Sequence, residues 1–300
     1  MTEIALLTQR KWVDPDPSTL DWYGKNILDE DALVIAACEA RGFHCTRVGW
    51  DDPTVDWSRF DAAVFRTTWD YFERYAEFRA WFERAEAQTR LINAPKTLRW
   101  NFDKHYLLDL QRAGVRIVPS AFLEIGTRVE LAAVLREQGW TEAVVKPAVS
   151  GAARHTYRID EASAAAHDPI VNELLVDEAM IVQPFQRAIV EGGEITVMVF
   201  GGRASHAVRK VAREGDFRVQ DDHGGSVHAH VPSDEEVDFA QRAMAAVDPT
   251  PVYGRVDFIR DNEGELAVME LELVEPELWF RLDPPSAERF AEALAAALSS

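Results

Sequence analysis

The segment Tyr253-Gly254-Arg255-Val256-Asp257-Phe258, followed after a short connection by Met269-Glu270-Leu271-Glu272, predicts two adjacent strands that carry acidic side chains. Both segments alternate with a period of two. Between them, Asp261-Asn262-Glu263-Gly264 is a turn in which Asn and Gly supply positive φ. The two glutamates then share one face of their strand, and pairing brings Asp257 opposite them. Carboxylates this close repel unless a cation neutralises them, and hard oxygen donors suit Mg²⁺. The alternative is a solvated hairpin face, which a lone Glu-x-Glu would indicate.

Two lysines lie where they can meet phosphate groups. Lys146 stands near the end of the apolar strand 143–147, which runs into the small-residue loop Ser150-Gly151-Ala152-Ala153. Backbone N–H groups of such a loop can lie against a phosphate. Lys104 lies at the start of a helix that continues through Leu110. The Walker A and dinucleotide-binding glycine patterns are absent, and each lysine has the alternative of being an ordinary surface cation.

A third motif is the apolar strand that ends in Gln183-Pro184-Phe185. Its main chain offers donors and acceptors of the kind a purine base pairs with, and Pro184 prevents it from continuing as an interior strand. Glu191 follows and is a candidate for binding ribose hydroxyls. In the strand 204–211, Arg209 and Lys210 point to opposite faces, so at most one of them faces a bound phosphate.

In this order the motifs resemble the ATP-grasp superfamily, over about residues 95 to 280. Within it the chain is similar to the glutathione synthetase and RimK-like group, and Gly254-Arg255-Val256-Asp257 is also similar to D-alanine–D-alanine ligases. The segments 66–71, 206–210 and 220–225 resemble the D-cycloserine synthetase type. One departure is Glu272, because the family usually has Asn at the last position of Glu-x-Asn. The extra negative charge leaves open whether one or two Mg²⁺ ions bind.

The resemblance implies an α/β ATP-grasp fold, preceded by a parallel βαβ lobe, that binds ATP with Mg²⁺ or Mn²⁺. The implied ATP-binding positions are Lys104, Lys146, Ser150, Gly151, Ala152, Gln183, Phe185 and Glu191. The implied metal ligands are Asp257, Glu270 and Glu272. Lys210 would contact phosphate, and Arg255 would lie near the group being transferred. This allocation fits phosphoryl transfer, which depends mainly on positioning and on neutralising charge.

The N-terminal segment alternates strands at 4–7 and 62–65 with helices at 31–40 and 73–86, a parallel βαβ pattern. Ligands in such sheets lie beyond the carboxyl ends of the strands, which favours Arg66 as a substrate residue, whereas the nearby Trp69 and Tyr71 are expected to pack. The full set of predicted substrate residues is Arg66, Arg218, Gln220 and His223. Two alternatives exist for the segment 218–230. It could be a solvated loop, or it could hold a transition metal at His228 and His230, although further ligands at recognisable spacing are lacking.

Length and composition fit a soluble enzyme with three lobes, predicted at 1–95, 96–182 and 183–300. The hydrophobic content of 47% allows a substantial core, and the net charge of −19 argues against nucleic-acid or membrane-surface partners. Cys38 and Cys45 are predicted to be free, buried thiols in a reducing cytosol. No signal peptide or membrane span is recognisable, so cytoplasmic localisation is expected. Since dimers are common among the resembled enzymes, a homodimer is an open expectation.

The function predicted is that of an ATP-dependent, ADP-forming ligase or cyclase that activates a small amino-acid-like substrate as an acyl phosphate. The D-cycloserine resemblance implies ring closure within one molecule such as O-ureido-D-serine. One alternative is intermolecular peptide-bond formation of the glutathione synthetase or RimK type. The other is a nucleotide-binding protein without turnover.

Overall fold

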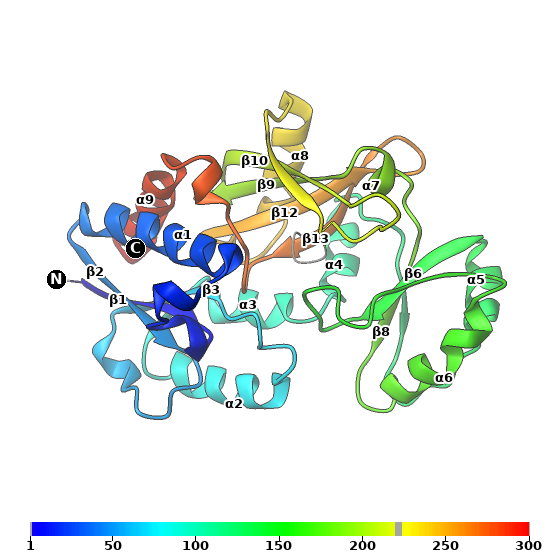
Figure 1. Cartoon of the computed structure of the whole chain (residues 1–300), viewed down its shortest axis with the longest axis horizontal. Coiled ribbons are helices and arrows are strands. Elements are labelled where there is room, and N and C mark those ends of the chain that lie inside the picture. Colours follow the sequence, from blue (N-terminus) through cyan, green and yellow to red (C-terminus); the bar gives the residue numbers. More distant parts are fainter. Residues whose placement is uncertain (1, 220–223, 300) are drawn as a thin grey trace.

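The computed structural model describes residues 2–219 and 224–299, which form three β-sheets with helices packed around them (Figure 1). The predicted α/β class is confirmed. Short 3-10 turns occur at Arg10–Trp12, Pro17–Thr19, Trp57–Arg59 and Phe280–Leu282. Within the described residues, none of the helices combines the length and apolar composition needed to cross a membrane.

The first sheet is parallel, with the strand order β2-β1-β3-β4. Its elements are β1 (Thr2–Thr8), β2 (Phe43–Gly49), β3 (Ala62–Thr67) and β4 (Arg90–Ile92), with helices α1 (Trp22–Glu39) and α2 (Tyr75–Glu86). The βαβ prediction is therefore confirmed. Helix α1 begins at Trp22 rather than at the predicted Asp31 because the Asp21 carboxylate caps it, accepting a hydrogen bond from the Gly24 N–H at 2.8 Å.

The second sheet is antiparallel, with the order β5-β8-β6-β7. Its strands are β5 (Ala121–Leu123), β6 (Glu142–Pro147), β7 (Tyr157–Asp160) and β8 (Met180–Pro184). Helices α5 (Leu131–Gln138) and α6 (Ala164–Leu174) pack on one face, where Val145 and Met180 share a core with Leu131 and Val171. The opposite face is free to contribute to a cavity.

The third sheet is antiparallel and has the order β11-β10-β9-β12-β13. Its strands are β9 (Glu194–Phe200), β10 (Arg203–Val211), β11 (Ser226–His230), β12 (Tyr253–Arg260) and β13 (Leu266–Glu272). Associated helices are α3 (Pro95–Asn101), α4 (Tyr106–Arg112), α7 (Ala188–Glu191), α8 (Asp234–Ala245) and α9 (Ser286–Ser299). Alternation along β12 sends Val256 and Phe258 into the core beneath α4 and α8, and Arg255 and Asp257 to the opposite face.

The β12–β13 register matches the sequence prediction. Asp257 is paired with Glu270 and Arg255 with Glu272, so the acidic side chains of the two strands are adjacent. In the turn, Gly264 has a φ of +88°. Asn262 does not adopt positive φ, so that part of the prediction is wrong. Its side-chain amide instead donates to the Phe185 carbonyl at 2.9 Å and its N–H donates to the Gln186 side chain, which holds the turn against the β8–α7 segment.

The three lobes predicted from the sequence remain a prediction as residue ranges, although the sheets show how the elements group. Strand β8 extends through Pro184, across the predicted boundary at 182. Helix α4, which the prediction assigned to the second lobe, packs through Leu107 and Leu110 on the core of the third sheet. Lys104, just before α4, is thereby held between the second and third sheets.

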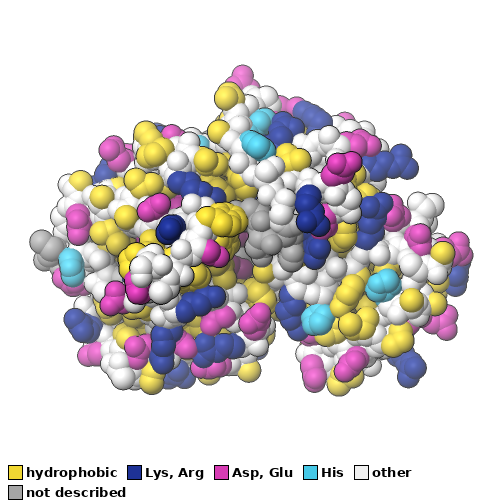
Figure 2. Space-filling model, viewed as in Figure 1, with side chains coloured by type: hydrophobic (Ala, Val, Ile, Leu, Met, Phe, Trp, Pro, Cys, Tyr) yellow, Lys and Arg dark blue, Asp and Glu magenta, His cyan; other side chains and the backbone are white. Residues whose placement is uncertain are grey.

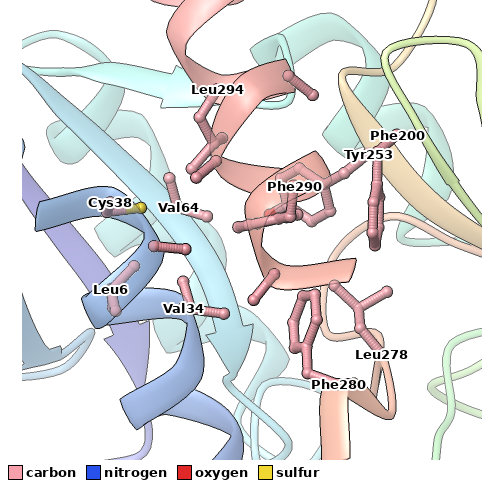
Figure 3. Close-up of a cluster of buried hydrophobic side chains, with 14 of the residues drawn as sticks. Leu6, Val34, Cys38, Val64, Phe200, Tyr253, Leu278, Phe280, Phe290 and Leu294 are labelled. Atoms are coloured by element: carbon pink, nitrogen blue, oxygen red, sulfur yellow. The ribbon is translucent and has the colours of Figure 1, made fainter. Parts of the chain in front are cut away.

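A buried cluster joins the first lobe to the C-terminal part of the chain (Figure 3). Figure 3 shows Leu6, Val34 and Val64 of the first lobe facing Phe290 and Leu294 of α9. Phe290 and Leu294 are fully buried. In addition, the Tyr253 hydroxyl accepts from the Phe65 N–H and donates to the Phe65 carbonyl at 2.9 Å. The first and third sheets are therefore joined by both apolar and polar contacts.

The cluster gives a stability prediction. Leu294→Ala should lower the free energy of unfolding by about 2–5 kcal/mol, because it leaves a cavity in a fully buried site. Leu282→Ala is the matched control: Leu282 is 39% exposed, and its loss should cost less than about 1 kcal/mol. Urea titrations at equilibrium measure both values, and equal losses in the two variants would contradict the assigned core.

Candidate active site

A cavity of about 610 Å³ lies where the three sheets meet. The second sheet and its loops contribute Lys146, Ser150 and Gln183, and the third sheet contributes Lys210 and Asp257. In Figure 2 the outline of the molecule is indented between the first lobe and the lobe of the second sheet, and basic and acidic side chains alternate over this face. Of the predicted site residues, the cavity brings together Lys104, Lys146, Ser150, Gly151, Ala152, Gln183, Phe185, Lys210, Arg218, Arg255, Asp257, Glu270 and Glu272.

The predicted metal ligands are neutralised by buried cations. Lys210 Nζ lies 2.9 Å from Asp257 Oδ2 and also pairs with Glu194. Arg255 Nη2 bridges Asp257, at 2.9 Å, and Glu272, at 2.6 Å. Lys104 Nζ, from the segment just before α4, lies 3.1 Å from Glu270. Three cations thus share four carboxylates from three strands, an arrangement that buried charges require.

The pKa values of these groups reflect burial set against opposite charge. Burial would raise the pKa of Asp257, but the charges of Arg255 and Lys210 outweigh it and lower this pKa to about 2. Glu270 behaves likewise, because Lys104 and Lys146 hold its pKa below the usual value in spite of burial. Burial and the neighbouring carboxylates raise the pKa of Glu272 in spite of Arg255. Two of the three carboxylates are therefore strongly favoured as anions.

The donor set fits Mg²⁺ or Mn²⁺ by its chemistry. Carboxylate oxygens are the ligands that such hard cations prefer, and the side chains of Glu270 and Glu272 are 28% and 18% exposed beside the cavity. In residues 2–219 and 224–299, however, His, Cys, Asp and Glu side chains do not gather in threes around one point in a metal-binding arrangement. Lys104 and Arg255 now neutralise these glutamates, so a metal ion bound there would have to replace part of their positive charge.

The loop predicted to bind phosphate, residues 150–153, lies between β6 and β7 and is held by Lys104. The Lys104 ammonium donates to the Ser150 carbonyl at 2.6 Å. Ala152 and Ala153 both have positive φ, +48° and +54°. A Cβ on Gly151 would lie 2.7 Å from Phe72 Cε1, so glycine permits the loop to approach the first lobe. Burial lowers the pKa of Lys146, and Glu270 partly offsets this.

At the other end of the cavity, apolar side chains form the wall expected for a base. Val118, Val144, Ile189, Phe217 and Met269 line it, and sequence reasoning missed them because they come from five separate segments. The Gln183 side chain donates to Ser120 Oγ at 3.0 Å. The prediction of a free main-chain donor at Phe185 is wrong: its N–H donates to the Glu142 carbonyl at 2.9 Å.

The ribose position needs a correction. Glu191, the predicted residue, is exposed at the end of α7 and does not line the cavity. The short helix α7 and the turn at Gly193 carry it away from the site. Glu194, at the start of β9, is buried and lines the cavity instead. The sequence signal that could have identified Glu194 is its place at the beginning of the apolar strand.

The end of the cavity beside Arg218 and Trp69 is the one predicted to bind substrate, and we call it the substrate end. Of the two predicted substrate residues that the structure describes, one lines the cavity and one does not. Arg218 lines it and pairs with Asp216 at 2.7 Å. Arg66 lies at the end of β3 as predicted but does not line this cavity: it is 2% exposed and pairs with Asp31 at 3.2 Å and Glu30 at 3.9 Å, so its role toward substrate stays a prediction. Of these carboxylates, Asp31 begins the helix predicted from sequence, whereas Glu30 comes from the part of α1 that the sequence analysis did not recognise. Gln220 and His223 lie outside the described residues.

Several residues of the substrate end were not predicted. Trp69, expected to pack, lines the cavity and donates from Nε1 to the Glu275 carbonyl at 2.9 Å, whereas Tyr71 is buried as expected. Glu275 itself lines the cavity, and burial raises its pKa to about 8. Trp279 also lines it, with a φ of +45° and the Arg255 guanidinium 4.9 Å above its ring. Glu275 and Trp279 lie in the segment that follows β13, which is the only signal the sequence offered for them.

The transition-metal alternative receives no support from the described residues. His230 Nε2 lies 3.0 Å from Glu236 and His228 Nε2 lies 2.9 Å from Ser226, so the two histidines have separate partners. Cys38 and Cys45 are free and buried, as predicted.

Known proteins share both parts of this architecture. Residues 4–93 match the family model of the N-terminal domain of D-cycloserine synthetase DcsG, and residues 159–277 match that of the RimK-like ATP-grasp domain. The cycloserine biosynthesis protein DcsG of Streptomyces lavendulae is 36% identical over 284 residues, which are 87% of this chain and 91% of that protein. The chain belongs to the ATP-grasp ligase family. Members of this family use ATP and Mg²⁺.

Solved structures agree with the assignment to the ATP-grasp ligases. The crystal structure of D-cycloserine synthetase DcsG has a TM-score of 0.85 and 32% identity, and the match covers 99% of each chain. The ATP-grasp ligase PsnB, complexed with a phosphomimetic variant of its minimal precursor, Mg and ADP, has a TM-score of 0.64 and 19% identity over 99% of each chain, a likeness of fold alone. The resemblance recognised in the sequence, including its D-cycloserine synthetase subgroup, is confirmed, and so is the ligase class.

The ion pairs of the site predict a large effect of one arginine on stability. Arg255→Met should lower the free energy of unfolding at neutral pH by about 3–5 kcal/mol, because it leaves buried Asp257 and Glu272 without a shared cation. Arg242→Met, which removes an exposed pair with Asp238, should change it by less than about 1 kcal/mol. Chemical denaturation compares the two, and a small loss for Arg255→Met would show that its charge is not needed there.

Proposed function

We propose that this ATP-grasp ligase forms ADP while it activates the carboxylate of a small amino-acid-like substrate as an acyl phosphate, and that an amine-type nitrogen of the same molecule then closes a ring. The observation that carries the proposal is similarity to DcsG along nearly the whole chain, the first lobe included. The first lobe supplies the wall at the substrate end of the cavity. Because the similarity to DcsG includes this wall, it supports the proposal that this chain acts on a substrate related to that of DcsG.

The proposed reaction has two steps. A substrate carboxylate oxygen attacks the γ-phosphorus, the bond from that phosphorus to the bridging oxygen breaks, and ADP leaves. The nitrogen then attacks the acyl carbon, the bond from carbon to the phosphate oxygen breaks, and inorganic phosphate leaves while the nitrogen loses a proton. Activation is required because a free carboxylate is a poor electrophile, whereas phosphate is a good leaving group.

The residues of this chain supply positioning and charge. Lys104, Lys146 and Lys210 would neutralise phosphate oxygens, and Arg255 would stabilise the charge that develops on the transferring group. Mg²⁺ held by Asp257, Glu270 and Glu272 would supply further neutralisation of the triphosphate. The apolar wall around Phe185 and Met269 would take adenine, and closure of the loop at Ser150 would exclude water that could hydrolyse an acyl phosphate.

A product analysis tests the reaction type. The enzyme is incubated with ATP, Mg²⁺ and a panel of amino-acid derivatives that includes O-ureido-D-serine, and ADP release is measured. Mass spectrometry should then find a cyclic product equal in mass to one substrate molecule less one water, as the two steps require. A product equal in mass to two joined substrates less water would instead support intermolecular ligation, the alternative function.

Replacement of one glutamate tests the proposed metal site. Glu270→Gln should lower kcat for ADP release by at least about 100-fold, as expected for the loss of an electrostatic group at the reacting phosphate. The fold should persist, because the substitution leaves the β12–β13 ladder intact. Glu288→Gln on the exposed surface of α9 is the control and should retain wild-type turnover. Wild-type kcat in Glu270→Gln would remove this residue from the catalytic site.

A further inference from the structure

A second, much smaller cavity adjoins the main one at its substrate end. It has a volume of about 10 Å³, which is room for roughly one water-sized group. Tyr23, Trp69 and Glu277 line both cavities, so the small one opens off the wall of the large one. Its inner end is formed by Ile27 and Glu30 of α1 and by Arg66 of β3. We call it the side pocket.

Two buried polar atoms of residues that line the side pocket have no hydrogen-bond partner. They are Arg66 Nη1 and Glu30 Oε2, on side chains that are 2% and 4% exposed. Arg66 Nε donates to Asp31 at 3.2 Å, and Glu30 Oε1 accepts from Arg281 Nη1 at 2.8 Å. Arg66 Nη2 lies 3.9 Å from Glu30 Oε2, an ion pair beyond hydrogen-bond distance. Both side chains line the side pocket, and buried polar atoms without partners are costly, so a group bound in the pocket would supply the partners that the protein itself does not.

The two atoms define the chemistry of that partner. Arg66 Nη1 can only donate and Glu30 Oε2 accepts, so the matching group must both accept and donate. A carboxylate would be repelled by Glu30 and Glu277, and an ammonium group has no lone pair to offer to the Arg66 donor. A neutral hydroxyl, or the end of a primary carboxamide, satisfies both atoms. The small volume allows only the terminal atom of such a group to enter.

We propose that the side pocket is a specificity subsite that takes the neutral, hydrogen-bonding end of the substrate, a hydroxyl or carboxamide, while its carboxylate lies at the cations of the main cavity. The inference rests on the proposed function for the identity of the ligand as an amino-acid-like molecule. It also gives Arg66 the substrate-binding role predicted from sequence, in the side pocket instead of the main cavity. Arg66 meets the substrate's far end within a buried ion-pair network, and the carboxylate that is activated lies elsewhere.

Two variants and a control isolate the subsite. Glu30→Gln keeps the shape of the side chain but can present a donor where the pocket now presents an acceptor. Ile27→Phe fills the pocket and leaves all charges in place. Asp29→Asn removes a charge from the same helix at an exposed position that lines neither cavity. Thermal unfolding of each variant shows that it is folded before binding is measured.

The probes are D- and L-serine with D- and L-alanine as the matched pairs without a hydroxyl, and asparagine as the carboxamide. Calorimetric titration in the presence of a non-hydrolysable ATP analogue should show that the wild type prefers serine of one configuration over alanine by roughly tenfold, the equivalent of one satisfied hydrogen bond. The preference should vanish in Glu30→Gln and Ile27→Phe and persist in Asp29→Asn. If Ile27→Phe does not fold, Glu30→Gln alone tests whether the preference for serine depends on the side pocket.

Equal affinity for serine and alanine, no binding of the hydroxyl and carboxamide probes, or a preference that survives both variants would overturn the proposal. So would a crystal structure of the serine complex in which an ordered water fills the side pocket and the hydroxyl lies elsewhere. ADP release in the amino-acid panel separates this result from the wider proposal. Turnover without the preference removes only the subsite, whereas the preference without any ADP release removes only the ligase reaction proposed.

Discussion

The pairing of β12 with β13 is the constraint on which the site depends. Antiparallel register sets Asp257 beside Glu270 and Arg255 beside Glu272. These charges are buried, and buried carboxylates are tolerated only when opposite charges and hydrogen bonds compensate for lost hydration. Lys210 and Arg255 provide this compensation from the same sheet, and the Thr196 hydroxyl adds a hydrogen bond to Asp257 at 2.8 Å. The site is therefore organised by its own ion pairs before any ligand binds.

This organisation explains how a strongly acidic chain can suit an anionic substrate. The net charge of −19 would repel ATP at long range, but the cavity gathers Lys104, Lys146, Lys210 and Arg255 within low-dielectric walls, where charges act more strongly than in water. The carboxylates that now hold three of these cations are also the hard oxygen donors suited to Mg²⁺. Binding of the metal and of the triphosphate would then be coupled. The metal would neutralise the carboxylates, and the triphosphate would neutralise the lysine and arginine side chains that those carboxylates release.

Sequence reasoning succeeded where local chemistry decides the structure. Alternation and a Gly turn were enough to predict the β12–β13 hairpin and its facing carboxylates, and an apolar strand before a small-residue loop was enough to predict that Lys146 of β6 lines the site. It failed where a residue's position depends on segments distant in sequence. Arg66 is drawn into the interior by Glu30 and Asp31 of α1, and Glu191 is turned away by the short helix α7. The apolar wall and the side pocket could not be predicted, because they exist only through the packing of separate lobes.

The central claim, that the bound carboxylate is activated by phosphorylation, is tested most directly by isotope transfer. The substrate identified by ADP release is prepared with ¹⁸O in both oxygens of its carboxylate and is turned over with unlabelled ATP in unlabelled water. If an acyl phosphate forms and is captured by nitrogen, one ¹⁸O atom per turnover must appear in the inorganic phosphate. Unlabelled phosphate, with ADP still released in step with product, would contradict this account.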